Sequence, residues 1–235
     1  MYRWSNKTKM RSLHYQSSVK LLASVTKTLT IIIGLSSTSY AEITENDFSE
    51  AQMLLQGTPH LQSLGAESTE ITYVLTRNGP DPIKGLVIGE VSAANAEAKR
   101  DVFYEFLYND EAKPFPKVIG FRSNPIIMFF LEWDIGETLN STTNKHSKTV
   151  LRNKIRAALW NDAKIEDVTI TYENKEHAGK RISISPFKEN KRIDAVKKRQ
   201  YEFIVSKAVP GGFKSLMSHY EEDGKTIKTE LSYTR

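Results

Sequence analysis

The sequence predicts an α+β fold: a curved antiparallel β-sheet, or an unclosed barrel, of about eight strands with a two-helix insert at about 124–160. On both sides of this insert, apolar and polar residues alternate, which is typical of strands that bury one face. The insert itself contains NPIIMFFLEWDI, the most apolar run after residue 41, and then the amphipathic segment KTVLRNKIRAALW. Because consecutive antiparallel neighbours are the simplest topology, we expect three strands before the helices and five after them.

The first 41 residues have the order of a secretory signal peptide. They contain six Lys or Arg residues and no acidic residue, an apolar stretch at 21–35, and small residues that end at Ser39-Tyr40-Ala41. We therefore expect cleavage near Ala41 and a periplasmic or secreted protein. A retained membrane anchor is the alternative, but the uninterrupted apolar core at 29–35 is far shorter than the ~20 residues that a membrane-spanning helix needs.

This leader accounts for the basic net charge. The whole chain has 33 Lys and Arg residues against 28 Asp and Glu residues, and removing the six basic residues of the leader leaves 27 against 28, a net charge of −1. The charge therefore gives no reason to expect a nucleic-acid partner. The absence of cysteine excludes disulfides, thiolate metal ligands and cysteine nucleophiles.

After the leader at 1–41, we expect an N-terminal arm at 42–65 and a single α+β domain at 66–235. The arm is acidic at its start and contains Gly57-Thr58-Pro59, which breaks a helix. Asp223-Gly224 is the strongest hairpin signal, because both residues tolerate the positive φ of a tight turn. The predicted strands are 69–76, 86–91, 102–108, 168–172, 182–184, 201–205, 213–220 and 227–233.

The first helix of the insert is expected to begin at Asn124-Pro125, because Asn caps free N–H groups and Pro fits the first turn. Six consecutive apolar residues at 126–131 would cover every side of this helix, so we expect it to be buried nearly all round. Gly136 is expected to weaken or end it. The second helix has one apolar face, formed by Leu151, Ile155, Ala158 and Leu159.

Glu132, within the apolar run, has two interpretations. A buried carboxyl with a shifted pKa would be a functional acid. Pairing with Arg122, Arg152 or Arg156 would make it structural, and we favour this interpretation because buried charges are usually paired.

The candidate ligand-lining residues are apolar side chains of the first helix and of the strand at 102–108. They are Ile127, Met128, Phe130, Leu131, Phe103 and Phe106. The basic segment at 188–199 has two interpretations. It is a docking patch for anionic lipid or a partner, or it is a solvated connecting turn or helix, and we favour the second interpretation. The patch would consist of Lys191, Arg192, Lys197 and Lys198.

No catalytic residue, metal ligand or cofactor is predicted. The histidines after the leader lack the spacing of a metal site, and no nucleophile elbow, P-loop or dinucleotide fingerprint occurs. These absences lower the expectation of an enzyme, although scattered residues can still form an active site.

Three features together resemble a set of exported proteins of Gram-negative bacteria that have no assigned function. The features are Asn124-Pro125, the RNKIRAAL segment at 152–159 and the AVPGG segment at 208–212. Separately, the order of elements is similar to the periplasmic lipoprotein-carrier fold, an unclosed β-barrel with a helical plug. That second resemblance implies architecture alone.

Three functions are compatible with these patterns. The first is non-catalytic binding of a lipid or other apolar ligand by an exported envelope protein, because a concave sheet closed by an apolar helix offers a cavity. The second is a structural or protein-interaction module of the periplasm, in which Phe129, Phe130 and Trp133 form only core. The third and least favoured is a hydrolase that uses Glu132 and His146.

Overall fold

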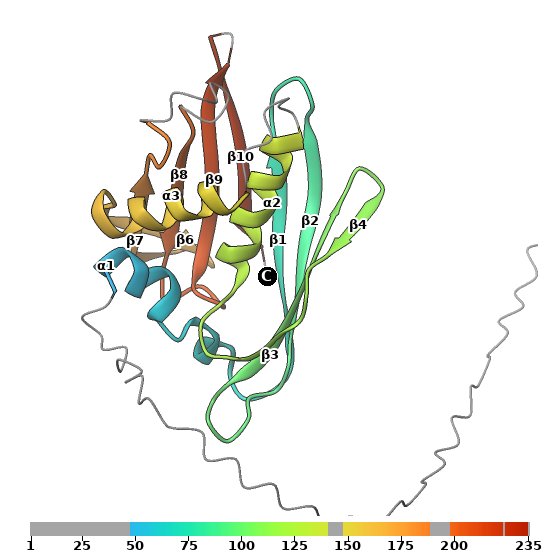
Figure 1. Ribbon diagram of the computed structural model, residues 1–235. Helices are drawn as coiled ribbons and strands as arrows, with labels where there is room; N and C mark the ends of the chain where they lie inside the picture. Colours follow the sequence, from blue (N-terminus) through green and yellow to red (C-terminus); the bar gives the residue numbers. More distant parts are fainter. Residues whose placement is uncertain (1–47, 141–147, 189–197, 223, 235) are drawn as a thin grey trace, which may run out of the picture. The chain divides into compact units, whose positions relative to one another are not determined.

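The computed structural model of the chain describes residues 48–140, 148–188, 198–222 and 224–234. The described residues form three short helical segments, two longer helices and ten strands (Figure 1). The helical segments are α1 (Glu50–Gln52), the π-helical η2 (Met53–Gly57), the 3-10 η3 (His60–Leu64), α2 (Ile126–Asn140) and α3 (Lys148–Asn161). The strands are β1 (Thr69–Arg77), β2 (Ile83–Val91), β3 (Arg100–Tyr108), β4 (Glu111–Pro114), β5 (Val118–Phe121), β6 (Lys164–Tyr172), β7 (Lys175–Ile184), β8 (Gln200–Val205), β9 (Phe213–Glu222) and β10 (Lys225–Tyr233).

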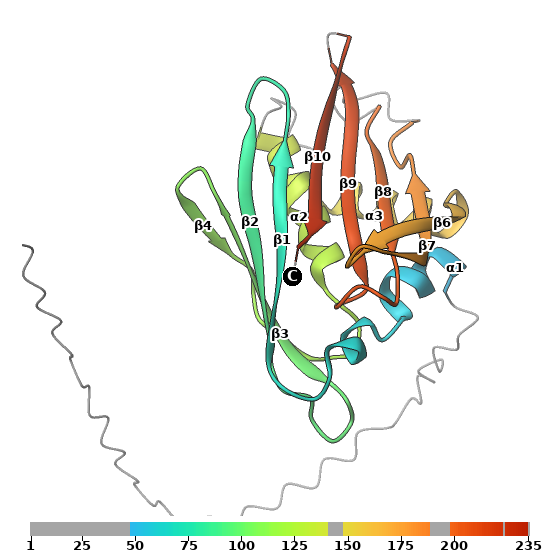
Figure 2. The same ribbon diagram turned by 180° about the vertical axis from the view of Figure 1, so that it is seen from behind.

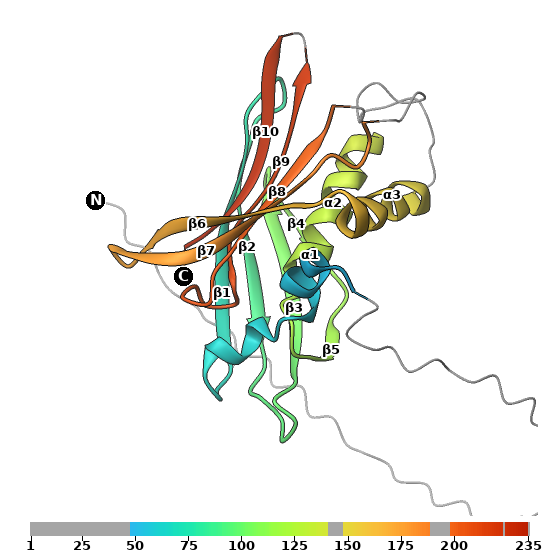
Figure 3. The ribbon, with the colours of Figure 1, turned by 90° about the vertical axis from the view of Figure 1, so that its left-hand side faces the viewer.

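The strands form one antiparallel sheet in the order β4-β3-β2-β1-β10-β9-β8-β7-β6, with β5 also paired to β3. The first and last long strands, β1 and β10, are neighbours in the middle of the sheet, with Tyr73 opposite Tyr233. The sheet is not closed, because β4 and β6 lie at its two ends. Since β5 and β6 lie near opposite ends of the sheet, the helices between them must cross it. The helices α1, α2 and α3 lie on one face of the sheet (Figures 2 and 3).

The predicted fold class is confirmed as a large, unclosed antiparallel sheet with helices, but the predicted number of about eight strands was too low. The two missed strands, β4 and β5, are only four residues long. Pro114 ends β4 in a position at the edge of the sheet, where a residue without an N–H is tolerated. The sequence did not indicate β4, because a strand of four mostly exposed residues shows no apolar alternation.

The start of α2 is as predicted. The Asn124 side-chain oxygen accepts a hydrogen bond from the Ile126 N–H at 3.0 Å, and it also accepts one from the Tyr104 hydroxyl at 2.9 Å. The Asn124 amide donates to the Gly211 carbonyl at 2.9 Å. The buried Asn124 amide therefore caps the helix. It also connects the first turn of α2 to β3 and to the loop that contains Gly211. Gly136 was expected to weaken or end the helix; it does not end it, because α2 continues to Asn140.

The next contacts of α2 are with the inner face of the sheet. Ile127 and Phe130 are buried, and the Trp133 ring packs on Phe106 with centroids 5.7 Å apart. The Trp133 indole N–H donates to the Tyr108 hydroxyl at 2.9 Å. The earlier segment at 50–64 joins the same core through Leu55 and Leu61, which are fully buried.

A buried ion pair holds the other side of α2. The Asp134 carboxylate is fully buried and accepts from the Arg199 guanidinium at 2.6 and 2.8 Å, from the Tyr201 hydroxyl at 2.8 Å and from the Ser218 hydroxyl at 2.9 Å. Burial raises the pKa of Tyr201 well above its usual range, so its hydroxyl stays protonated and donates. The Arg199 guanidinium also lies 4.4 Å from the centroid of the Tyr220 ring. These contacts connect α2 to β8 and β9.

His60 is a second buried titratable group. Its ring packs on Phe213 with centroids 4.9 Å apart, and its Nε2 lies 2.9 Å from the Leu54 carbonyl oxygen. Gly212 has a φ of +82° and faces this ring, and a Cβ there would overlap it. Burial lowers the pKa of His60 from 6.5 to about 4, although the hydrogen bond to Leu54 acts in the opposite direction.

We expect the Asp134→Asn substitution to lower the free energy of unfolding by about 3–5 kcal/mol, because it leaves the Arg199 charge buried without its partner. The matched control is Glu132→Gln on the same helix, which breaks an ion pair with Arg152 that is partly exposed to solvent. We expect that control to cost less than about 1 kcal/mol. Urea unfolding measures both, and equal losses in the two variants would contradict the assigned role of Asp134.

The low pKa of His60 predicts a loss of stability in acid. The folded protein favours the neutral ring, whereas the unfolded chain binds a proton below pH 6.5, so the stabilisation is complete above pH 6.5 and is lost as the pH falls toward 4. The loss should reach about 3 kcal/mol at most. Urea unfolding between pH 7 and pH 4 should show a smaller loss in His60→Gln than in the parent. The control His219→Gln, on β9, should keep the loss of the parent, and identical pH profiles for the parent and His60→Gln would refute the prediction.

Candidate functional site

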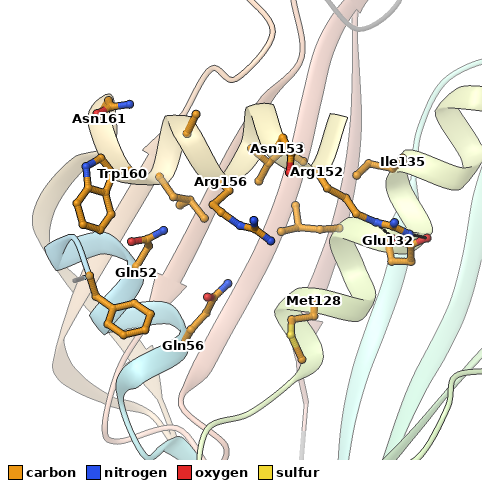
Figure 4. Close-up of a pocket in the computed structure, with 15 residues that line it drawn as sticks. Gln52, Gln56, Met128, Glu132, Ile135, Arg152, Asn153, Arg156, Trp160 and Asn161 are labelled. Atoms are coloured by element: carbon orange, nitrogen blue, oxygen red, sulfur yellow. Dashed lines mark hydrogen bonds and ion pairs between the residues drawn. The ribbon is translucent and has the colours of Figure 1, made fainter. Parts of the chain in front are cut away.

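A groove of about 930 Å³ lies between the N-terminal helical segment, α2 and α3 (Figure 4). Its described lining residues belong to 48–56, 128–135 and 152–161, so the groove is built from helices rather than from the sheet. The Ser49 hydroxyl donates to the Leu159 carbonyl at 2.8 Å and also accepts from the Gln52 N–H at 3.2 Å. These two bonds fix the N-terminal wall of the groove against α3.

The floor of the groove is apolar. Met128, Leu131 and Ile135 follow one another at helical spacing along one side of α2. Ile155 and Leu159 do the same on α3. Leu131, Ile135, Ile155 and Leu159 are buried, whereas the Met128 side chain remains 38% exposed. The floor is therefore a connected apolar surface with its most accessible point at Met128.

Two aromatic side chains stand at one end of the groove. Phe48 is 40% exposed and Trp160 is 46% exposed, and both are among the lining residues. Polar groups accompany them, since Gln52 and Gln56 extend from the N-terminal wall (Figure 4). Large side chains exposed together in a hollow are typical of a surface that contacts another molecule.

The other end carries charge. The Arg152 guanidinium donates to the two Glu132 carboxylate oxygens at 2.7 and 2.8 Å, and the Lys148 ammonium lies 3.6 Å from the same carboxylate. This confirms the favoured interpretation of Glu132 as a paired residue, with Arg152 as the partner among the three arginines considered. The Glu132 side chain is 30% exposed, so Glu132 lies at the rim of the groove and is not a buried acid.

The structure distributes the predicted ligand-lining residues over three places. Met128 and Leu131 line the groove, whereas Ile127, Phe130 and Phe106 are in the core between α2 and the sheet. Phe103 alternates with the buried residues of β3 and lines a separate shallow hollow on the outer face of the sheet, beside Lys117. Whether any of them contacts a ligand remains a prediction.

The predicted basic patch is described only in part. Lys198 is exposed, and Lys191, Arg192 and Lys197 lie outside the described residues, as does His146.

Among the groove residues that sequence reasoning missed are five large side chains from two segments, the N-terminal helical segment and α3. They are Phe48, Gln52, Gln56, Arg156 and Trp160. The signal for the two on α3 was available, because Arg152, Arg156 and Trp160 recur every four residues and so share one side of the helix. No local pattern indicates that Phe48 would lie opposite them, because the pairing of these segments is made by tertiary contacts.

Within the ranges that the structure covers, no group of three or more His, Cys, Asp or Glu side chains could hold a metal ion. No helix of the described chain has the length and apolar character to cross a membrane.

No protein-family model matches the chain, and no curated protein sequence matches it. Among solved structures, it is similar to the crystal structure of a LolA superfamily protein from Nitrosomonas europaea. The two share 6% sequence identity, the match covers 79% of this chain and 91% of the other, and the TM-score is 0.21. At this TM-score the likeness carries no argument about function.

Proposed function

We propose that this chain is an exported, non-catalytic protein that holds a lipid or another apolar ligand in the groove between the N-terminal helical segment, α2 and α3. The observation that carries the proposal is the apolar floor of the groove together with the exposed side chains of Phe48, Met128 and Trp160. The volume of about 930 Å³ lies near the upper end of the range of ~300–1,000 Å³ usual for small-molecule sites.

The export part of the proposal is supported by the leader at 1–41, whose basic start, apolar centre and small residues before Glu42 are those of a secretory signal peptide. A protein delivered to the envelope meets membrane lipids and their breakdown products. That location fits a ligand with an alkyl chain.

The non-catalytic part is supported by the state of the three carboxylates on α2. The Glu132 carboxylate is paired with Arg152. The Asp134 carboxylate is fully buried and accepts hydrogen bonds from Arg199, Tyr201 and Ser218. Glu137 forms ion pairs with Arg77 at 3.4 Å and with Lys113 at 3.5 Å. A general acid or base must reach the proton that it transfers. None of the three carboxylates is placed for that task, which disfavours the hydrolase.

A structural or protein-interaction module is the second candidate. The observation in its favour is that Phe129, Phe130 and Trp133 are all buried, as such a module requires. In that case the groove would receive a side chain or a helix of a partner protein. The two candidates differ in whether the groove binds a free small amphiphile.

The test is a series of neutral 1-alkanols from hexanol to decanol, added to protein purified after expression of the full chain, with tryptophan fluorescence and native mass spectrometry as readouts. We expect the affinity to rise about fourfold per methylene, because each buried methylene contributes about 0.8 kcal/mol. The fluorescence change should disappear in Trp160→Phe, which keeps the core Trp133, while binding persists in the mass spectrum.

Two charge substitutions complete the test. Met128→Glu places a charge in the apolar floor and should weaken decanol binding at least tenfold, whereas Ile119→Glu, at a residue on β5 that is 75% exposed, should leave it unchanged. No binding of any alkanol, with one reproducible crosslinked envelope protein instead, would refute the proposal in favour of the interaction module.

A further inference from the structure

The side of α3 that faces the groove carries two arginines with different surroundings. Arg152 uses its guanidinium on Glu132. Arg156, one turn further along, is exposed, and within the described ranges it has no ion-pair partner. Figure 4 shows the Arg156 side chain reaching from α3 over the middle of the groove, with Gln56 and Met128 on the opposite walls. Among the described residues, Arg156 is thus an unpaired cation beside an apolar floor.

Of the described residues, the charged ones that line the groove are Glu132, Arg152 and Arg156, which sum to a charge of +1. Since Glu132 and Arg152 neutralise one another, the unbalanced charge belongs to Arg156. Charge complementarity therefore favours an anion at this point of the groove and disfavours a cation.

The shape of the floor restricts the apolar part of the ligand. Met128, Leu131 and Ile135 form a single row along α2, and a span of seven residues in a helix is about 10 Å long. Polar side chains flank this row: Gln52 and Gln56 on one side and Arg152 on the other. The row along α2 accommodates one extended alkyl chain.

We propose that the groove binds a single-chain amphiphile with a carboxylate head group, such as a free fatty acid, with Arg156 as the residue that pairs with the carboxylate. The alkyl chain lies along Met128 and Leu131. The guanidinium suits this role, because its planar fork can donate two parallel hydrogen bonds to a carboxylate. This inference rests on the proposed function and adds to it the class of ligand and its orientation.

The experiment compares three probes with the same ten-carbon chain: decanoate, 1-decanol and decyltrimethylammonium. Each is titrated below its micelle concentration into protein purified after expression of the full chain, at low salt. Decanoate should bind about tenfold more tightly than decanol, because a charge-assisted hydrogen bond is added, and the cation should bind more weakly than decanol.

The variants assign this preference to one residue. Arg156→Gln should bind decanoate no better than decanol, and Arg156→Lys, which keeps the charge without the fork, should retain part of the preference. The matched control Lys154→Gln removes a cation from the same helix outside the groove and should keep the full preference. Because Arg156 is exposed, these variants should fold as the parent does.

The outcomes separate the two levels of the argument. Equal affinity for decanoate and decanol, or a preference that survives in Arg156→Gln, would overturn the carboxylate assignment while leaving an apolar groove. No binding of any of the three probes would overturn the proposed function itself.

Discussion

The position of α2 depends on a carboxylate that has no access to water. Asp134 lies in the middle of α2 among apolar core side chains, and its burial is tolerable only because Arg199, Tyr201 and Ser218 supply hydrogen bonds. On the other side, Trp133 bonds to Tyr108 of β3. The helix is thus tied to strands on both sides of the β1–β10 pair, and this fixes which of its faces is turned toward the sheet.

That orientation decides where a ligand can bind. Ile127, Phe130 and Trp133 fill the space between α2 and the inner face of the sheet, so the side of the helix left for other contacts is the one that carries Met128. The groove forms where this side meets α3 and the N-terminal helical segment. An amphiphile bound there would be accessible from solvent along its length, which suits reversible uptake and release.

The sequence predicted the elements that have a strong local signal. The Asn124 cap, the apolar face of α3 and the strand predicted at 69–76 were all correct, because each depends on neighbouring residues. The predictions failed where an element is short or where tertiary contacts override a local preference. β4 and β5 have too few residues to show alternation, and Gly136 stays helical because the packing of α2 outweighs the weak helical preference of one glycine. The groove itself required segments about one hundred residues apart to meet, as in the Ser49–Leu159 hydrogen bond, and no local pattern contains that information.

Amide hydrogen exchange, with and without saturating decanoate, tests most directly the claim that the inner face of α2 is occupied by core and that its outer side receives the ligand. In the free protein, the amides at 127–134 should be among the slowest to exchange, since they are tied to the sheet. Decanoate should then slow exchange in 53–57 and 152–160 and leave β1, β3 and β9 unchanged. Slowing in those strands, with none in the helices that form the groove, would place the ligand against the sheet and contradict the account.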